Sequence, residues 1–125
     1  MQSPAHKDPV VLLVEDDRDM RWLLRNVLVQ EGCSVITRAT GKGALAALHR
    51  VRLDLILLPM TLPDMSGLRV VRRARRIHPR VPIIVISATS NQGIVQECLR
   101  LGVLAYLLKP FHRMERLGRI REALG

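Results

Sequence analysis

Aromatic residues and cysteines are scarce in this sequence of 125 residues, which contains one tryptophan, one tyrosine, one phenylalanine and two cysteines. A buried core must therefore be aliphatic, and the hydrophobic fraction of 48% is large enough to supply it. Cys33 and Cys98 belong to no metal-binding or redox motif. We expect them to be two buried, reduced thiols and not a disulfide.

Long apolar runs are also missing. No run approaches the roughly 20 residues that a membrane-spanning helix needs, and the first nine residues lack the apolar stretch of a signal peptide. We therefore expect a cytoplasmic protein that does not enter a membrane. Residues 1–9 are polar and predict a flexible tail, while residues 10–125 have the length of a single domain.

Acidic residues are outnumbered, because 20 lysines and arginines face 11 aspartates and glutamates, for a formal net charge of +9. This charge favours an acidic partner, a nucleic acid or an anionic lipid surface, and composition does not distinguish among them. Six arginines occur without an intervening acid: Arg69, Arg72, Arg73, Arg75, Arg76 and Arg80. The simplest interpretation is a solvated helix face whose aliphatic stems cover apolar surface.

The alternative is a basic docking surface for an acidic protein or a phosphate backbone, formed by Arg69, Arg72, Arg73 and Arg76. No aromatic residue lies between these arginines. That argues against a single-stranded nucleic acid stacked on aromatic rings.

Short apolar runs alternate with amphipathic segments from Val10 onwards, which is typical of repeated βα units and a parallel sheet. We expect strands at residues 10–14, 34–37, 53–58, 83–86 and 105–108. We expect helices at residues 18–31, after Thr40, at 67–78, at 91–101 and at 113–124. The first helix should turn these side chains inward: Met20, Leu23, Leu24, Val27 and Leu28.

Four motifs in this order resemble the receiver domains of response regulators: Val11–Asp17, Asp54–Gly67, Ile83–Ala88 and Ala105–Phe111. The resemblance extends over about residues 10–124. It implies a flavodoxin-like, doubly wound α/β fold with five helices and five parallel strands in the order 2-1-3-4-5. Ligands of such a sheet bind beyond the carboxyl ends of its strands.

The resemblance also implies a role for each residue at those ends. An aspartate at position 59 would receive a phosphoryl group, and Ser87 and Lys109 would contact its oxygens. Mg²⁺ would be held by Asp16, the carboxylate at position 59 and the backbone carbonyl of Thr61, with Glu15 acting through water. Tyr106 would be the switch aromatic, and the Lys109–Pro110 peptide would be cis, as it usually is in the family.

Position 59 is a proline, whose side chain has neither a nucleophile nor a metal ligand. Asp54 does not replace it, because five residues of strand at ~3.3 Å each put it ~16 Å away. Asp64 lies on the following loop, where no receiver pattern has a nucleophile. We therefore expect no phosphoacceptor, at most a vestigial and weak Mg²⁺ site, and an ion pair between Lys109 and Asp16.

We expect a phosphorylation-independent signalling module of a two-component phosphorelay that is not an enzyme and needs no cofactor. Its partner would be another protein, its own output domain or a second copy of the chain. The expected docking face is formed by residues 91–101, 105–108 and 113–124. A nucleic-acid-binding domain that uses the arginines of residues 69–80 is the alternative. A metal-dependent phosphotransfer or hydrolase site at Asp16 and Lys109 is disfavoured, because it lacks a nucleophile.

Overall fold

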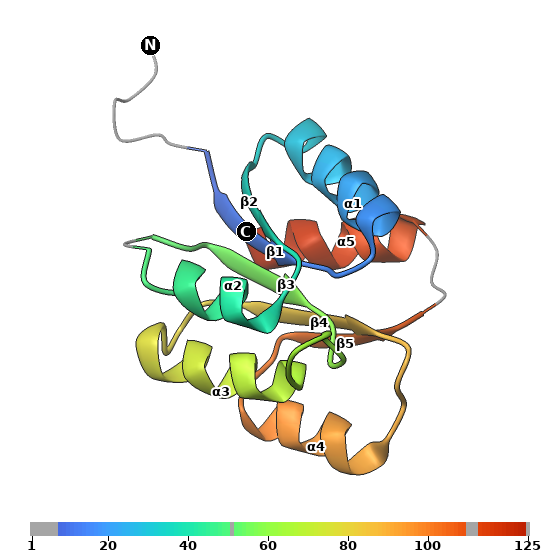
Figure 1. Cartoon of the computed structure of the whole chain (residues 1–125). Helices are drawn as coiled ribbons and strands as arrows, with labels where there is room; N and C mark the ends of the chain where they lie inside the picture. Colours follow the sequence, from blue (N-terminus) through green and yellow to red (C-terminus); the bar gives the residue numbers. More distant parts are fainter. Residues whose placement is uncertain (1–7, 51, 110–112, 125) are drawn as a thin grey trace.

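Strands and helices alternate along the whole chain in a computed structural model that describes residues 8–50, 52–109 and 113–124, with the side chains of 113–117 excepted (Figure 1). The strands are β1 Val10–Val14, β2 Ser34–Arg38, β3 Leu55–Leu58, β4 Ile83–Ser87 and β5 Ala105–Leu108. The helices are α1 Arg18–Gln30, α2 Gly41–Ala47, α3 Gly67–Ile77, α4 Gln92–Arg100 and α5 Arg113–Leu124.

The strands form one parallel sheet in the order β2-β1-β3-β4-β5. The central strand β3 is buried at every position, as expected for a strand covered on both faces. Helices α1 and α5 cover one face, and α2, α3 and α4 cover the other (Figure 1). The predicted fold class and strand order are confirmed.

Two aliphatic cores lie on opposite faces of the sheet, because successive strand residues point to opposite sides. Ile56 of β3 packs with Val70 and Val71 of α3 on one face. Leu57 packs on the other face with Leu28 of α1 and Ile120 of α5. Aromatic rings contribute little to either core among the described residues: Tyr106 is half-buried, and Trp22 on α1 is 66% exposed.

Polar side chains cap the amino-terminal ends of four helices. Asp17 accepts a hydrogen bond from the Met20 amide at 2.8 Å, and Thr40 accepts one from the Gly43 amide at 3.0 Å. Ser66 and Asn91 cap α3 and α4 in the same way. Gly32 follows α1 with a φ of 87°, a left-handed conformation that favours glycine and ends the helix where the sequence predicted.

Two sequence-based expectations need correction, and two others fall outside the described residues. Leu23 is 43% exposed and not part of the inward face, since that face is centred on Leu24, Val27 and Leu28 and Leu23 lies at its edge. Strand β3 begins two residues later than expected. Most of the predicted tail (residues 1–7) and Pro110 of the predicted cis peptide lie outside the described residues.

Asp54 lies before β3, where its carboxylate accepts a hydrogen bond from the Val10 amide at 2.7 Å and pairs with Arg52 at 3.0 Å. Val10 begins β1, so Asp54 lies at the amino-terminal edge of the sheet, as the strand geometry predicted. None of the helices in the described ranges has the length and apolar character needed to cross a membrane.

Candidate functional site

Residues from four strands meet at the carboxyl edge of the sheet. Glu15 follows β1 and is 2% exposed, and Pro59 follows β3 and is buried. Ser87 ends β4 and is 3% exposed, while Lys109 follows β5. Parallel strands bring their carboxyl ends to one edge, which is why residues so far apart in the sequence become neighbours.

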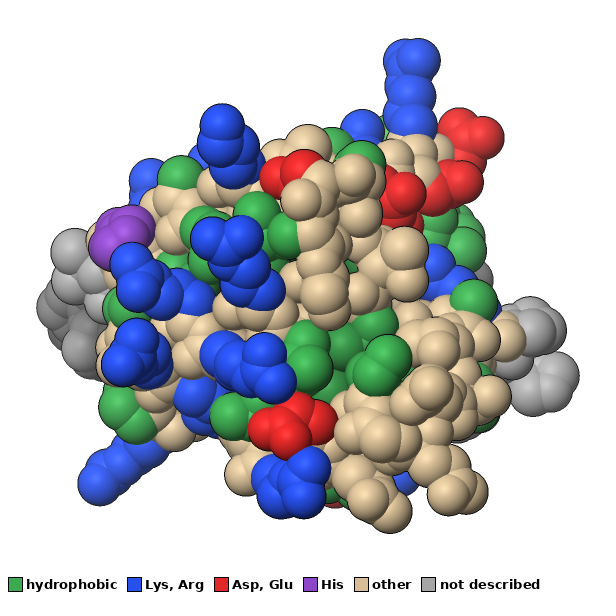
Figure 2. Space-filling model, turned by 60° about the horizontal axis from the view of Figure 1, so that its bottom comes forward, with side chains coloured by type: hydrophobic (Ala, Val, Ile, Leu, Met, Phe, Trp, Pro, Cys, Tyr) green, Lys and Arg blue, Asp and Glu red, His purple; other side chains and the backbone are tan. Residues whose placement is uncertain are grey.

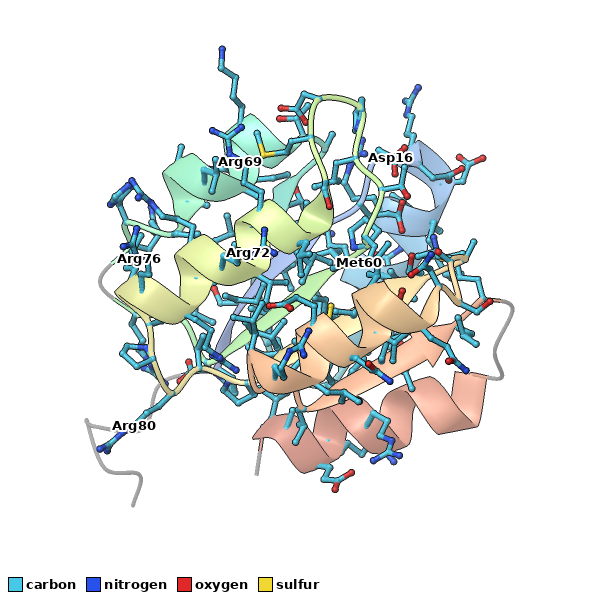
Figure 3. All side chains as sticks on the ribbon, turned by 90° about the horizontal axis from the view of Figure 1, so that it is seen from below. Asp16, Met60, Arg69, Arg72, Arg76 and Arg80 are labelled. Carbon is cyan, nitrogen blue, oxygen red and sulfur yellow. The ribbon has the colours of Figure 1, made fainter. Side chains whose placement is uncertain are left out.

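Lys109 pairs with Glu15, whose Oε1 lies 3.1 Å from the Lys109 Nζ. The other carboxylate oxygen of Glu15 accepts a hydrogen bond from the Asp17 amide at 3.0 Å. The predicted ion pair between Lys109 and Asp16 was therefore wrong. Glu15 still continues β1, because its amide donates to the Arg38 carbonyl of β2, and its side chain turns inward. Asp16 has left the strand and is exposed (Figure 3).

Ser87 is held by two backbone amides. Its hydroxyl oxygen accepts from the amides of Met60 and Thr89, each at 3.4 Å. The Tyr106 hydroxyl donates to the Thr89 carbonyl at 2.8 Å. Burial raises the pKa of Tyr106, so this hydroxyl remains a hydrogen-bond donor at neutral pH. Ser87, Thr89 and Tyr106 thus form one connected polar group next to Pro59.

The loop from Pro59 to Gly67 is fixed at both ends. The Gly67 amide donates to the Met60 carbonyl at 2.7 Å, and Thr61 and Ser66 form an antiparallel bridge. Met60 is 3% exposed, and its sulfur lies 3.6 Å from the Cys98 sulfur of α4. A Cβ on Gly67 would lie 1.9 Å from the Pro59 carbonyl oxygen. Only glycine permits this close approach of α3 to the end of β3.

Asp64, at the tip of this loop, contacts the start of α2. Its carboxylate accepts from the amides of Gly41 and Lys42 at 2.8 and 2.9 Å. These hydrogen bonds, that from Lys42 first, lower the pKa of Asp64. From the sequence, we weighed Asp64 only as a replacement for the missing phosphoacceptor. The contact with α2 was not predicted, because Asp64 and the start of α2 are more than 20 residues apart in the sequence. Its negative charge suits the amino-terminal end of a helix.

The donors at the carboxyl edge do not fit the Mg²⁺ site that the resemblance implies. Mg²⁺ prefers carboxylate and carbonyl oxygens in a near-octahedral arrangement. Asp16 and the Thr61 carbonyl remain as donors, while Glu15 is occupied by Lys109 and position 59 offers no oxygen from its side chain. The described residues contain no cluster of three or more His, Cys, Asp or Glu that could hold a metal ion.

The arginines of α3 fall into two groups. Arg75 is half-buried and donates to four backbone carbonyls: Leu101 and Val81 at 2.6 Å each, Gly102 at 2.7 Å and His78 at 3.4 Å. Burial lowers the pKa of Arg75. The four arginines of the predicted docking surface, in contrast, are all exposed: Arg69, Arg72, Arg73 and Arg76. The sequence did not distinguish Arg75, since the fold brings these acceptors together from two places: Leu101 and Gly102 after α4, and Val81 between α3 and β4.

The strand order and the polar residues at the carboxyl edge define a flavodoxin-like domain of the receiver type. The chain belongs to the response regulator receiver domain family, whose model matches residues 11–121. It is 31% identical over 116 residues to the chemotaxis protein CheY of Thermotoga maritima, covering 92% of this chain and 93% of that protein. The matched relatives differ in length, since the chain spans only 25% of the DNA-binding transcriptional regulator NtrC of Salmonella typhimurium, to which it is 30% identical.

Solved structures agree with this assignment. A CheY-like receiver domain protein from Methanospirillum hungatei superimposes with a TM-score of 0.90 at 27% identity, covering 94% of each chain. The complex of CheX with CheY, beryllofluoride and Mg²⁺ from Borrelia burgdorferi contains a chain that matches with a TM-score of 0.85 at 27% identity. That match covers 94% of this chain and 90% of the other. These similarities favour a receiver domain over the nucleic-acid-binding alternative.

Proposed function

We propose that this receiver domain acts without phosphorylation, as a protein-interaction module of a two-component phosphorelay. The observation that carries the proposal is Pro59, which directly follows β3 at the position where the family resemblance has a phosphoacceptor aspartate. An acyl phosphate requires a carboxylate nucleophile, and proline has none. Neither Asp54, at the other edge of the sheet, nor Asp64, whose carboxylate on the following loop is hydrogen-bonded to the first amides of α2, replaces it.

The surroundings of Pro59 support this proposal. Lys109 has its charge balanced by Glu15, and the Ser87 hydroxyl is engaged by two backbone amides. Both residues therefore have a structural use in a domain that never holds a phosphoryl group. Removing one partner of a buried ion pair leaves the other charge uncompensated and destabilises the fold, so Lys109 contributes to stability even without a phosphoryl group. We propose that the domain has no catalytic step of its own and no resident Mg²⁺.

We propose that the partner is a protein that docks on α4 and β5. Leu108 of β5 is 45% exposed, and it borders a hollow of about 360 Å³. The hollow is lined by Ser90, Gln92, Val95, Gln96, Tyr106 and Leu108. An exposed leucine and an amphipathic tyrosine beside a shallow hollow are suited to a protein interface. Tyr106 also links this surface to Ser87 through Thr89, so a partner that moves Tyr106 would act on the carboxyl edge.

Intact-mass spectrometry tests the proposal. The protein is incubated with Mg²⁺ and acetyl phosphate, beside a receiver domain that carries an aspartate at the equivalent position. We expect the control to gain the mass of one phosphoryl group and this chain to gain none. A phosphoryl adduct on this chain that hydroxylamine removes, as it does an acyl phosphate, would overturn the proposal.

A further inference from the structure

Four exposed arginines follow one another along α3, at Arg69, Arg72, Arg73 and Arg76. Their spacing of three, one and three residues puts them on one side of the helix, because positions i, i+3, i+4 and i+7 share a face. The stripe is about 10 Å long at 1.5 Å per residue. Figure 3 shows Arg69, Arg72 and Arg76 in succession along α3, with Arg80 beyond its carboxyl-terminal end.

The arginine stripe borders a groove between α2 and α3 with a volume of about 390 Å³. Its lining consists of Leu45, Ala46, His49, Arg69, Arg72, Arg73 and Arg76. No acidic side chain belongs to this lining. Figure 2 shows the lysine and arginine side chains gathered on one side of the face that α2, α3 and α4 form.

The charge of this groove is not balanced within the described part of the molecule. Among the described residues, none of the stripe arginines takes part in an ion pair. The basic residues that do are Arg52, Arg100, Lys109, Arg119 and Arg121. Arg75 differs from the stripe because its guanidinium already donates hydrogen bonds to backbone carbonyls. The guanidinium N–H donors of the stripe therefore remain able to bind an acidic group of another molecule. The net charge of +9 would speed the approach of an acidic molecule.

We propose that the α2–α3 groove binds an acidic amphipathic helix of a protein partner. Carboxylates at i, i+3, i+4 and i+7 of such a helix would match the stripe, and arginine binds carboxylates through paired N–H donors. The groove also has an apolar side, formed by Leu45 of α2 and the exposed methyl group of Ala46. An apolar residue of an amphipathic helix has a contact there, whereas a phosphate backbone has none.

This surface goes beyond the proposed function, because it is separate from the α4–β5 face and does not depend on Pro59. It would give the domain a second contact, with a partner chosen by charge. The two surfaces share no lining residue. Loss of one interaction therefore leaves the other measurable.

Fluorescence anisotropy with a labelled synthetic peptide tests the groove. The probe is a helix-forming peptide of about 18 residues with glutamates at i, i+3, i+4 and i+7 beside a leucine. We expect the peptide to bind and the Kd to rise steeply with salt. A double variant, Arg72→Glu with Arg76→Glu, should weaken binding at least roughly tenfold, because attraction becomes like-charge repulsion.

The matched control is Arg18→Glu with Arg25→Glu, which makes the same charge change at two exposed arginines of α1, on the opposite face of the sheet. We expect it to change the Kd by less than about threefold, through net charge alone. Arg72→Ala with Arg76→Ala provides a milder variant if charge reversal prevents folding. A second peptide of the same composition, with its glutamates spread around the helix, should bind more weakly.

Three results would overturn the proposal. The first is no peptide binding at low salt, and the second is an equal loss of affinity in the α3 and α1 double variants. The third is a labelled DNA duplex that binds more tightly than the peptide and depends on Arg72 and Arg76. That result would assign the groove to nucleic acid.

Discussion

Arg75 and Arg76 are neighbours in the sequence, yet the structure gives them different roles. Arg75 joins the end of α3 to the turn after α4 through the carbonyls of Leu101 and Gly102, and to the segment before β4 through Val81. Arg76 is exposed and lines the α2–α3 groove. One residue of the pair thus contributes to stability and the other to surface charge.

The Arg75→Ala variant should be less stable by about 2–4 kcal/mol, because it leaves part-buried carbonyls without their charged donor. Arg76→Ala should change the free energy of unfolding by less than about 0.5 kcal/mol, as for other exposed sites. Urea unfolding followed by circular dichroism measures both. Equal effects of the two substitutions would show that the Arg75 hydrogen bonds add nothing to stability.

Residue roles at the carboxyl edge were only partly predictable. The motifs predicted that Glu15, Ser87 and Lys109 would meet, and the structure brings them together: Lys109 pairs with Glu15, and its amide donates to the Ser87 carbonyl at 2.9 Å. The motifs did not predict whether Lys109 would pair with Glu15 or with Asp16. That choice depends on where β1 ends, since a shift of one residue turns a side chain from the sheet edge to solvent.

At the scale of elements, the loop after β3 is positioned by α3 more than by its own sequence. Gly67 begins α3 directly against the Pro59 carbonyl, and Asp64 reaches across to the amides of α2. Two helices therefore hold this loop in place. The sequence predicted the bounds of most helices and strands to within a residue or two, because caps such as Thr40 and Asn91 and glycines such as Gly32 act locally. It could not predict contacts between separate segments.

Gly67→Ala should destabilise the domain by about 2–4 kcal/mol, since the added methyl group meets backbone atoms that have little freedom to move. Gly118→Ala is the matched control, because Gly118 lies in α5 and an added Cβ meets nothing within 4 Å. That control should gain roughly 0.5–1 kcal/mol from helix propensity. Urea unfolding of both variants provides the comparison, and a Gly67→Ala variant as stable as the parent would show that the loop is free to yield.

At the scale of the whole molecule, the parallel sheet built from βα units was predictable from the alternation of apolar and amphipathic segments, whereas the strand order 2-1-3-4-5 was implied by the resemblance to receiver domains. The connection rules for parallel βα units leave few arrangements of the chain, and the family resemblance selects one of them. In our proposal, the absence of a Mg²⁺ site follows mainly from position 59, because Pro59 supplies no carboxylate. Restoring that position therefore tests how much of the rest of the site remains.

Pro59→Asp should bring back Mg²⁺ binding, because Asp16, the Thr61 carbonyl and the new carboxylate would stand at one edge of the sheet. For a Kd of about 1 mM, about 10 mM Mg²⁺ would stabilise the variant by ~1.4 kcal/mol, or roughly 5 °C in Tm. The parent should show no such rise. Thermal unfolding with and without Mg²⁺ measures this, and Asp16→Asn added to Pro59→Asp should abolish the gain.

If the Pro59→Asp variant folds but its Tm does not rise with Mg²⁺, the carboxyl edge of the sheet differs from the receiver pattern at more than position 59. A clear Mg²⁺ response of the parent that Asp16→Asn removes would show that the present acids suffice. In the first case the assignment of Asp16 and Thr61 as the remaining ligands would be withdrawn. In the second case the proposal that the parent domain holds no Mg²⁺ would be withdrawn, and Asp16 would stay as a ligand.

The exposed position of Trp22 affects how this molecule is observed. It is the one tryptophan of the chain and lies on the solvent side of α1, away from both aliphatic cores. Its indole is already in water in the native state, so its emission wavelength will shift little when the cores come apart. Intrinsic fluorescence is therefore a poor reporter of unfolding here, but it is a sensitive, built-in reporter of any molecule that covers α1.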